Sequence, residues 1–140
     1  KSNIKSTSLL ANVLIKNKAN TCDAYEAILL RDGFLTEGSA SNIFIVKNEV
    51  IKTPKLSNKL LPGITRKFLT DLIAQHKLHY HECDISEGEL LESDEIFCSS
   101  STNPVVPITQ LDNKQIREKA GPVTMKLYSL AQNYIRNSYL

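Results

Sequence analysis

A single acidic residue, Glu37, lies between a short hydrophobic pair and a run of small polar residues that leads into an apolar segment. A buried carboxylate costs several kcal/mol unless a cation or hydrogen bonds meet it. An acid at the edge of a core therefore indicates a cationic partner, which we interpret as the ring nitrogen of a ligand. From the residues alone, a plain hairpin with a solvent-facing acid explains the stretch 35–46 nearly as well.

Three further polar spots fall where strands or turns are expected to meet the starts of helices. They are Lys5, residues 63–65, and the serine and threonine run 99–102. The start of a helix offers free N–H groups and a partial positive charge, which suit a phosphate group. Hydroxyl groups after a strand add donors. Ordinary caps and turns that satisfy their own backbone are the alternative explanation.

The composition is that of one globular domain. The chain has 140 residues, a formal net charge of +2 and 23% charged residues, with both signs spread along it. No basic block predicts nucleic-acid binding, and no apolar run approaches the length of a membrane span. Three widely spaced cysteines, Cys22, Cys83 and Cys98, predict reduced thiols in a cytosolic protein.

The histidines do not predict a metal centre. His76, His79 and His81 are close in sequence, but no Asp, Glu or Cys stands nearby at a recognisable ligand spacing. A solvated strand face is the simpler explanation of these residues.

The elements that must position the polar residues read as a mixture of helices and strands. Apolar residues at helical spacing predict a helix over residues 6–18. Helices are also predicted near residue 61, over residues 87–93 from a capping-box pattern, and from residue 121 onward. Strands are predicted over residues 24–30, 34–36, 42–46, 50–53, 79–85, 95–99 and 105–109, with a hairpin turn at 31–33.

This irregular alternation predicts an α+β fold around a mixed, largely antiparallel sheet. The first half is expected to be an antiparallel meander behind one helix. Glu26, between Tyr25 and Ala27, is expected to point outward from its strand.

Several segments together resemble one family, in its order and spacing across nearly all of the chain. They include Thr-Glu-Gly-Ser-Ala-Ser-Asn at 36–42 and Leu-Pro-Gly-Ile-Thr-Arg at 61–66, and the others are residues 3–6, 26–33, 94–97 and 121–123. The pattern is similar to the C-terminal half of class IV (fold type IV) pyridoxal-phosphate-dependent aminotransferases, and within them to the D-amino-acid (D-alanine) aminotransferases. The resemblance implies a pseudobarrel with flanking helices, one cofactor-binding domain over residues 1–140, and an N-terminal domain that this chain lacks.

The resemblance also implies the cofactor, pyridoxal 5′-phosphate, and a role for each matching residue. Lys5 matches the catalytic lysine that forms the Schiff base, and Glu37 matches the acid that pairs with the pyridine nitrogen. Leu61 matches the apolar residue packed against the cofactor ring. The residues that match the phosphate-binding positions are Gly63, Ile64, Thr65, Ser100, Ser101 and Thr102.

The implied reaction is transamination between a (D-)amino acid such as D-alanine and a 2-oxo acid such as 2-oxoglutarate, by a cytoplasmic homodimer. Residues 103–107 are less typical of these enzymes, and Pro104 resembles aminodeoxychorismate lyases, which use the same cofactor. Branched-chain aminotransferases are a third relative. The family's N-terminal domain supplies an arginine to the phosphate and the groups that grip the substrate carboxylate, so a protein of these 140 residues alone would be an inactive module.

Overall fold

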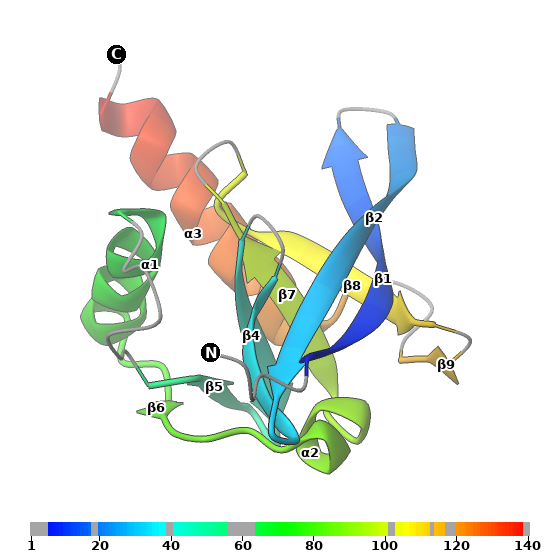
Figure 1. Cartoon of the computed structure of the whole chain (residues 1–140). Coiled ribbons are helices and arrows are strands. Elements are labelled where there is room, and N and C mark those ends of the chain that lie inside the picture. Colours follow the sequence, from blue (N-terminus) through cyan, green and yellow to red (C-terminus); the bar gives the residue numbers. More distant parts are fainter. Residues whose placement is uncertain are drawn as a thin grey trace.

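The computed structural model of the chain describes residues 6–17, 20–38, 41–55, 64–100, 103–112, 114–116 and 120–138. The elements in these residues are β1 (Ser6–Asn17), β2 (Asn20–Arg31), β3 (Phe34–Gly38), β4 (Asn42–Lys47), β5 (Val50–Thr53), α1 (Ile64–Gln75), β6 (Tyr80–Glu82), α2 (Glu87–Leu91), β7 (Glu95–Ser99), β8 (Val106–Leu111), β9 (Lys114–Gln115) and α3 (Pro122–Ser138). Figure 1 shows α1 and α3 together on one side of the sheet and α2 at its lower end. The fold is thus the predicted α+β arrangement.

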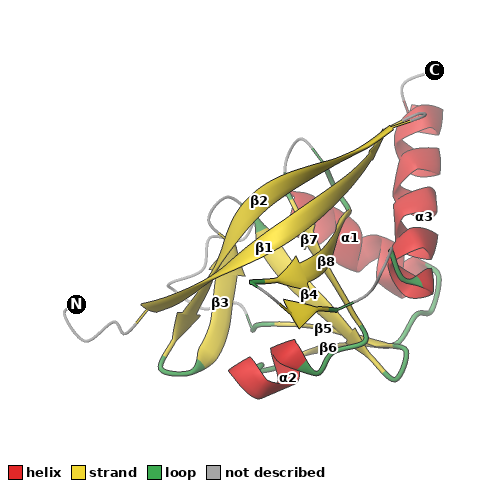
Figure 2. Cartoon of the chain, turned by 90° about the vertical axis from the view of Figure 1, so that its right-hand side faces the viewer, coloured by secondary structure: helices red, strands yellow, loops and turns green. Residues whose placement is uncertain are grey.

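The strands form one curled sheet in the order β3-β2-β1-β8-β7-β4-β5-β6, with β9 paired to β8. Neighbours are antiparallel except β5 and β6, which run parallel. The long β1–β2 hairpin crosses the molecule in Figure 2. One core cluster collects buried side chains from β2, β3, β4, β7 and β8. The sheet must therefore curl around this cluster, as the predicted pseudobarrel requires.

The strands β4 and β7 separate two cores, because side chains along a strand alternate between its faces. Ile43 and Ile45 belong to the cluster inside the curl, whereas Phe44 and Phe97 belong to the cluster beneath α1 and α3. Phe44 and Phe97 are paired in register, and their rings stack with centroids 4.9 Å apart. Burial of each such ring contributes about 1.5–3 kcal/mol.

Two predictions for the first half of the chain are wrong. The helix predicted over residues 6–18 is not formed by the described residues of that segment: Ser6–Asn17 is strand β1, paired with β2 along its whole length and with β8 in part. The apolar residues of this segment are compatible with a helix or with a strand, and the pairing partners decide between them. The predicted meander also fails, because β4 pairs with β7 rather than with β3.

The short helix α2 begins as its capping-box pattern predicts. The Ser86 hydroxyl accepts a hydrogen bond from the Glu89 N–H at 3.1 Å, and the Glu89 carboxylate accepts one from the Ser86 N–H at 3.1 Å. The helix ends at Leu91, two residues earlier than predicted. The predicted strand over 79–85 is shorter, since only Tyr80–Glu82 pairs with β5. No helix within the described residues is long and apolar enough to cross a bilayer.

The helix α3 receives its N-terminal cap from the sheet. Gly121 and Pro122 precede and begin the helix, and neither offers a side-chain acceptor. The buried Glu95 carboxylate of β7 accepts hydrogen bonds from the Thr124 N–H and hydroxyl, each at 2.7 Å, and from the Val123 N–H at 3.2 Å. A negative charge at this end of a helix is favourable. Glu95 therefore ties α3 to the central strand.

We expect Gly121→Ala to lower the free energy of unfolding by about 1–3 kcal/mol, because a Cβ there would overlap the Glu95 side chain. Urea unfolding of the full-length protein measures the change. Gly88→Ala in α2 is the matched control, since its added Cβ meets no atom closer than 3.9 Å. A Gly121→Ala variant as stable as the wild type would contradict this account of the α3 cap.

Candidate functional site

The structure describes part of the predicted site. Thr65 and Ser100 are fully described, and both are half-buried. Glu37 and Ile64 are described through their backbone positions in β3 and α1. The predicted residues outside the described part of the chain are Lys5, Leu61, Gly63, Ser101 and Thr102.

The backbone places Glu37 beside β2, directly after an irregularity in the strand. The register changes from Leu30 opposite Leu35 to Leu29 opposite Glu37, so Thr36 is an extra residue, and its hydroxyl donates to the Leu29 carbonyl at 2.9 Å. Such β-bulges are common next to active sites. Leu29 also pairs with Ser8 of β1. Ser8 and Glu37 therefore lie on opposite sides of Leu29, and their backbones are about 10 Å apart at ordinary strand spacing.

The motif that follows Glu37 meets the serine run at the end of β7. Asn42, the first residue of β4, pairs in register with Ser99, the last residue of β7. The chain then turns sharply: the Ser100 N–H donates to the Asn103 carbonyl at 3.0 Å, and the Asn103 N–H donates to the Ser100 hydroxyl at 3.3 Å. Asn42 and the pair Ser99 and Ser100, far apart in sequence, thus lie at the same end of the β4–β7 strand pair.

Ser99 supplies an observation that fits a bound ligand. Its side chain is fully buried, and its hydroxyl has no hydrogen-bond partner within the described structure. An unsatisfied buried hydroxyl costs about 1–3 kcal/mol, so native structures seldom retain one without a reason. A phosphate oxygen can accept a hydrogen bond from such a hydroxyl group. The end of β7 therefore fits the predicted phosphate site.

The start of α1 is also suited to an anion. The helix begins at Ile64, and its first turn carries no acidic residue. The turn instead carries Arg66 and Lys67, which add positive charge to the positive end of the helix dipole. Free N–H groups at such an end bind phosphate without further side chains.

Glu26 lies inward, contrary to the expectation that it points away from the protein. Its Oε2 accepts a hydrogen bond from the Ser41 hydroxyl at 2.9 Å. The Cys98 thiol lies near the same pair: burial raises the pKa of Cys98 to about 12, and the Glu26 charge adds to the rise. β2, the start of β4 and the end of β7 therefore share a polar cluster beside the core inside the curl.

The raised pKa of the Cys98 thiol predicts that the folded protein loses stability in alkaline solution. The pKa of the thiol is higher in the folded state than in the unfolded state. The contribution of the thiol to the free energy of unfolding is therefore complete below about pH 9 and is lost as the pH rises from about 9 toward 12. The stability advantage of the wild type over Cys98→Ala should fall by about 2 kcal/mol between about pH 8 and about pH 10.5. Urea unfolding at both pH values checks this, with Cys83→Ala as the control; an advantage that does not change with pH would contradict it.

Sequence reasoning missed a buried polar cluster at the start of α1. Arg66 is 3% exposed, and its Nη2 donates to the Pro54 carbonyl at 2.7 Å and lies 3.5 Å from Glu82 Oε2. The Tyr80 hydroxyl donates to the same Glu82 oxygen at 2.7 Å. Burial is the main reason that the pKa of Tyr80 is raised, and the hydrogen bond to Glu82 and the charge of Glu82 add to the rise. The sequence offered one sign of this cluster. Arg66 is a basic residue in the first turn of a predicted helix, where a cation is unfavourable.

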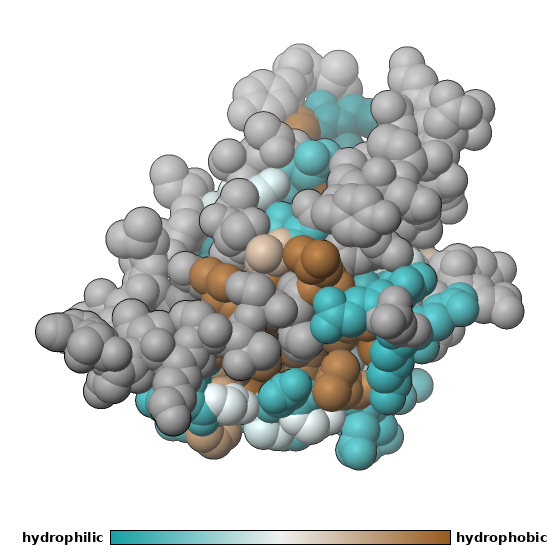
Figure 3. Space-filling model, turned by 45° about the vertical axis from the view of Figure 1, so that its right-hand side comes forward, coloured by the Kyte–Doolittle hydropathy of each residue, from teal (hydrophilic) through white to brown (hydrophobic). Residues whose placement is uncertain are grey.

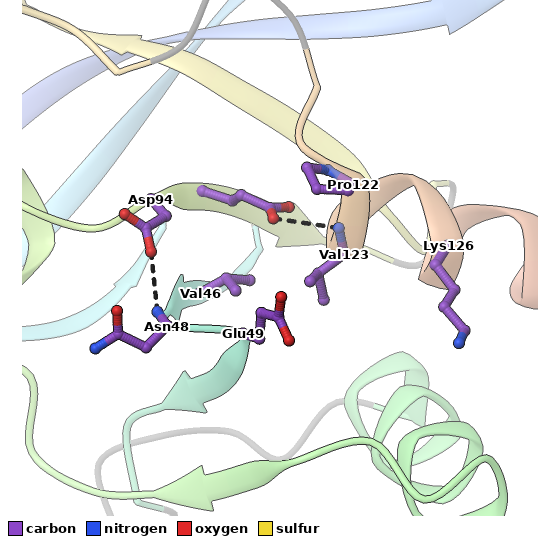
Figure 4. A pocket seen from close by; sticks show the side chains of 8 residues that line it. Val46, Asn48, Glu49, Asp94, Pro122, Val123 and Lys126 are labelled. Atoms are coloured by element: carbon purple, nitrogen blue, oxygen red, sulfur yellow. Dashed lines mark hydrogen bonds between the residues drawn. The ribbon is translucent and has the colours of Figure 1, made fainter.

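An open pocket of about 470 Å³ lies elsewhere, between the β4–β5 turn and the start of α3 (Figure 4). Asn48, Glu49, Val123 and Lys126 are among its lining residues. None of the predicted site residues that the structure describes is among its lining residues. In the described part of the chain, no group of three or more His, Cys, Asp or Glu side chains could hold a metal ion.

Known proteins resemble this chain over most of its length. The family model for amino-transferase class IV matches residues 1–111. A D-alanine aminotransferase of Bacillus licheniformis is 43% identical over 133 residues, which cover 94% of this chain and 47% of that protein. The chain thus spans about half the length of the curated relatives it matches.

Solved structures show the same fold. The branched-chain aminotransferase of Thermoproteus uzoniensis, solved with norvaline, superposes with a TM-score of 0.76 at 31% identity, over 83% of this chain and 39% of that one. An aminotransferase of Brucella abortus bound to the cofactor PLP superposes with a TM-score of 0.68 at 28% identity, over 74% of this chain and 36% of that one.

Proposed function

We propose, on the premise that this chain belongs to the amino-transferase class IV family, that residues 1–140 are the C-terminal, cofactor-binding half of a pyridoxal-phosphate-dependent aminotransferase. The observation that carries the proposal is the meeting of described residues from two motif-bearing segments at one end of the β4–β7 strand pair. Asn42 pairs with Ser99, and Ser41 bonds to Glu26. The buried hydroxyl of Ser99, which has no hydrogen-bond partner in the described structure, supports a ligand at this place.

Pyridoxal phosphate supplies an electron sink for the α-carbon of an amino acid. Glu37 would keep the ring nitrogen protonated, since an opposite charge in contact favours the charged form. Lys5 would attach the cofactor through its amine, and once released it would move the proton at the substrate α-carbon. Leu61 would pack against the ring and keep water from it.

The phosphate group would hold the ring in place. The residues that we assign to it are Gly63, Ile64, Thr65, Ser100, Ser101 and Thr102. Their support is the start of a helix at Ile64, where backbone N–H groups suit an anion, the acid-free first turn of α1, and the hydrogen bonds between Ser100 and Asn103 after β7. A fixed phosphate would orient the reacting carbon relative to the lysine. Such orientation lowers the activation barrier of the reaction.

The substrates that we propose are a D-amino acid such as D-alanine and a 2-oxo acid such as 2-oxoglutarate. The support is the identity of 43% to a D-alanine aminotransferase. A branched-chain aminotransferase is the second candidate, favoured by the superposition with the Thermoproteus uzoniensis enzyme.

One assay with the full-length protein separates the candidate reactions. D-alanine with 2-oxoglutarate should give D-glutamate at a higher kcat/KM than L-leucine with the same acceptor. Aminodeoxychorismate serves as the third substrate, with 4-aminobenzoate as the product to follow, because pyruvate forms from D-alanine too. A preference for L-leucine would overturn the D-amino-acid assignment, and 4-aminobenzoate as the main product would overturn transamination.

We further propose that the whole protein is a cytoplasmic homodimer whose N-terminal domain lies outside this chain. The free thiols of Cys83 and Cys98 support a reducing compartment. Figure 3 shows apolar side chains near the middle of one face, and Leu10 of β1 and Phe34 of β3 are large exposed hydrophobic residues. Exposed apolar surface of this kind is typical of a face that another domain or subunit covers.

A further inference from the structure

We propose that Arg66 is a positioning residue, which holds the first turn of α1 where that turn meets the phosphate group of the cofactor. The inference rests on the proposed function and extends it, because Arg66 acts through the backbone of the helix start rather than by touching the ligand.

The geometry ties the helix start to the sheet through β5. Arg66 Nη2 donates to the carbonyl of Pro54, which directly follows β5, at 2.7 Å, and both residues are buried. Thr53, the last residue of β5, is fully buried and donates its hydroxyl to the Ile43 carbonyl of β4 at 2.8 Å. The first turn of α1 is thereby fixed to β5, and through β5 to β4.

Glu82 lies near the same nitrogen of the guanidinium. Its Oε2 lies 3.5 Å from Arg66 Nη2 and accepts the Tyr80 hydroxyl at 2.7 Å. The Glu82 side chain is 39% exposed, so water screens the ion pair and limits its contribution. A single partly exposed carboxylate is a weak reason to bury an arginine.

The position of Arg66 is costly for stability alone. A buried cation in the first turn stands at the positive end of the helix dipole, where cations are disfavoured. Sites where a sequence breaks such a rule are often functional. A role in fixing the first turn of α1 explains why the cost is retained, because the hydrogen bond from Arg66 to Pro54 sets the position of the turn that would bind the phosphate.

The test compares two ligands that differ only in the phosphate group. The dissociation constants of pyridoxal phosphate and of pyridoxal are measured by absorbance and fluorescence titration of the full-length protein. In Arg66→Met the affinity for pyridoxal phosphate should fall about tenfold or more, while the affinity for pyridoxal stays within about twofold of the wild type. Arg66→Lys, which keeps the charge but loses the planar fork, should show the same selective loss to a smaller extent.

Lys67→Met is the matched control, because it removes one positive charge from the same turn without touching Pro54. Lys67 is exposed, and its Nζ lies 3.3 Å from Asp71. Equal losses in Lys67→Met and Arg66→Met would overturn the proposal in favour of a simple charge effect. Equal losses for both ligands in Arg66→Met would overturn it in favour of a general structural defect.

If Arg66→Met does not fold, Arg66→Lys decides by the same ratio of the two affinities. A wild-type protein that binds pyridoxal phosphate no better than pyridoxal would overturn the phosphate site itself. A wild type that binds neither ligand would overturn the proposed function, which separates that failure from a failure of Arg66 alone.

Discussion

Replacing Lys5 with alanine in the full-length protein should lower the rate of transamination by at least about 10²–10⁴-fold, the usual contribution of one general acid–base group. The loss should be larger still, because the same amine attaches the cofactor. Single-turnover measurements with D-alanine check the rate directly. Added small primary amines should restore part of the activity, since they can move the proton without the side chain.

Lys126→Ala is the control for this variant, because Lys126 is an exposed lysine of α3 that lines the pocket beside the β4–β5 turn and has no assigned role in the site. It should leave the rate unchanged. A Lys5→Ala protein with wild-type activity would show that another group moves the proton, and the assignment of Lys5 would be wrong.

Replacing Glu37 with glutamine should lower kcat by about 10²–10³-fold with little change in folding, a loss comparable to that of one transition-state charge partner. A neutral amide does not favour the protonated ring, so the pKa of the ring nitrogen should fall. The deficit should therefore grow as the pH rises. A pH–rate profile of both proteins measures it.

Glu49→Gln is the matched control, since Glu49 is an exposed acid in the β4–β5 turn. It should match the wild type at every pH. An equal and pH-independent rate in Glu37→Gln would remove the role of the carboxylate at the ring nitrogen.

Local signals predicted the parts of the fold that depend on neighbouring residues. β5 and β7 have the predicted bounds, Val50–Thr53 and Glu95–Ser99, because short apolar runs with turns on both sides leave few alternatives. The Asp32-Gly33 turn also has the predicted hairpin form, with positive φ at both residues.

Pairings between distant segments were not predictable from such signals. β1 was mistaken for a helix because its apolar positions suit either element, and only its pairing with β2 and β8 decides. The pairing of β4 with β7 joins residues about fifty positions apart, and no local pattern encodes it. Burial on both faces, which specifies β4 and β7, is a property of the assembled sheet.

The same limit applies to the candidate site. The resemblance assigned Lys5, Glu37 and the phosphate-binding residues, whose motifs are local in sequence. Arg66 and Glu26 acquire their roles only through partners on other strands, Pro54 and Ser41. A lone arginine or glutamate in sequence most often predicts a solvated side chain.

The most direct test of the account is to locate the cofactor on the chain. The full-length protein is incubated with pyridoxal phosphate, reduced with borohydride to make the lysine bond permanent, digested, and mapped by mass spectrometry. One modified peptide that carries the cofactor on Lys5 is expected, and none when Lys5 is alanine. A cofactor found on another lysine, or on none, would contradict the assignment of this chain as a pyridoxal-phosphate-binding domain.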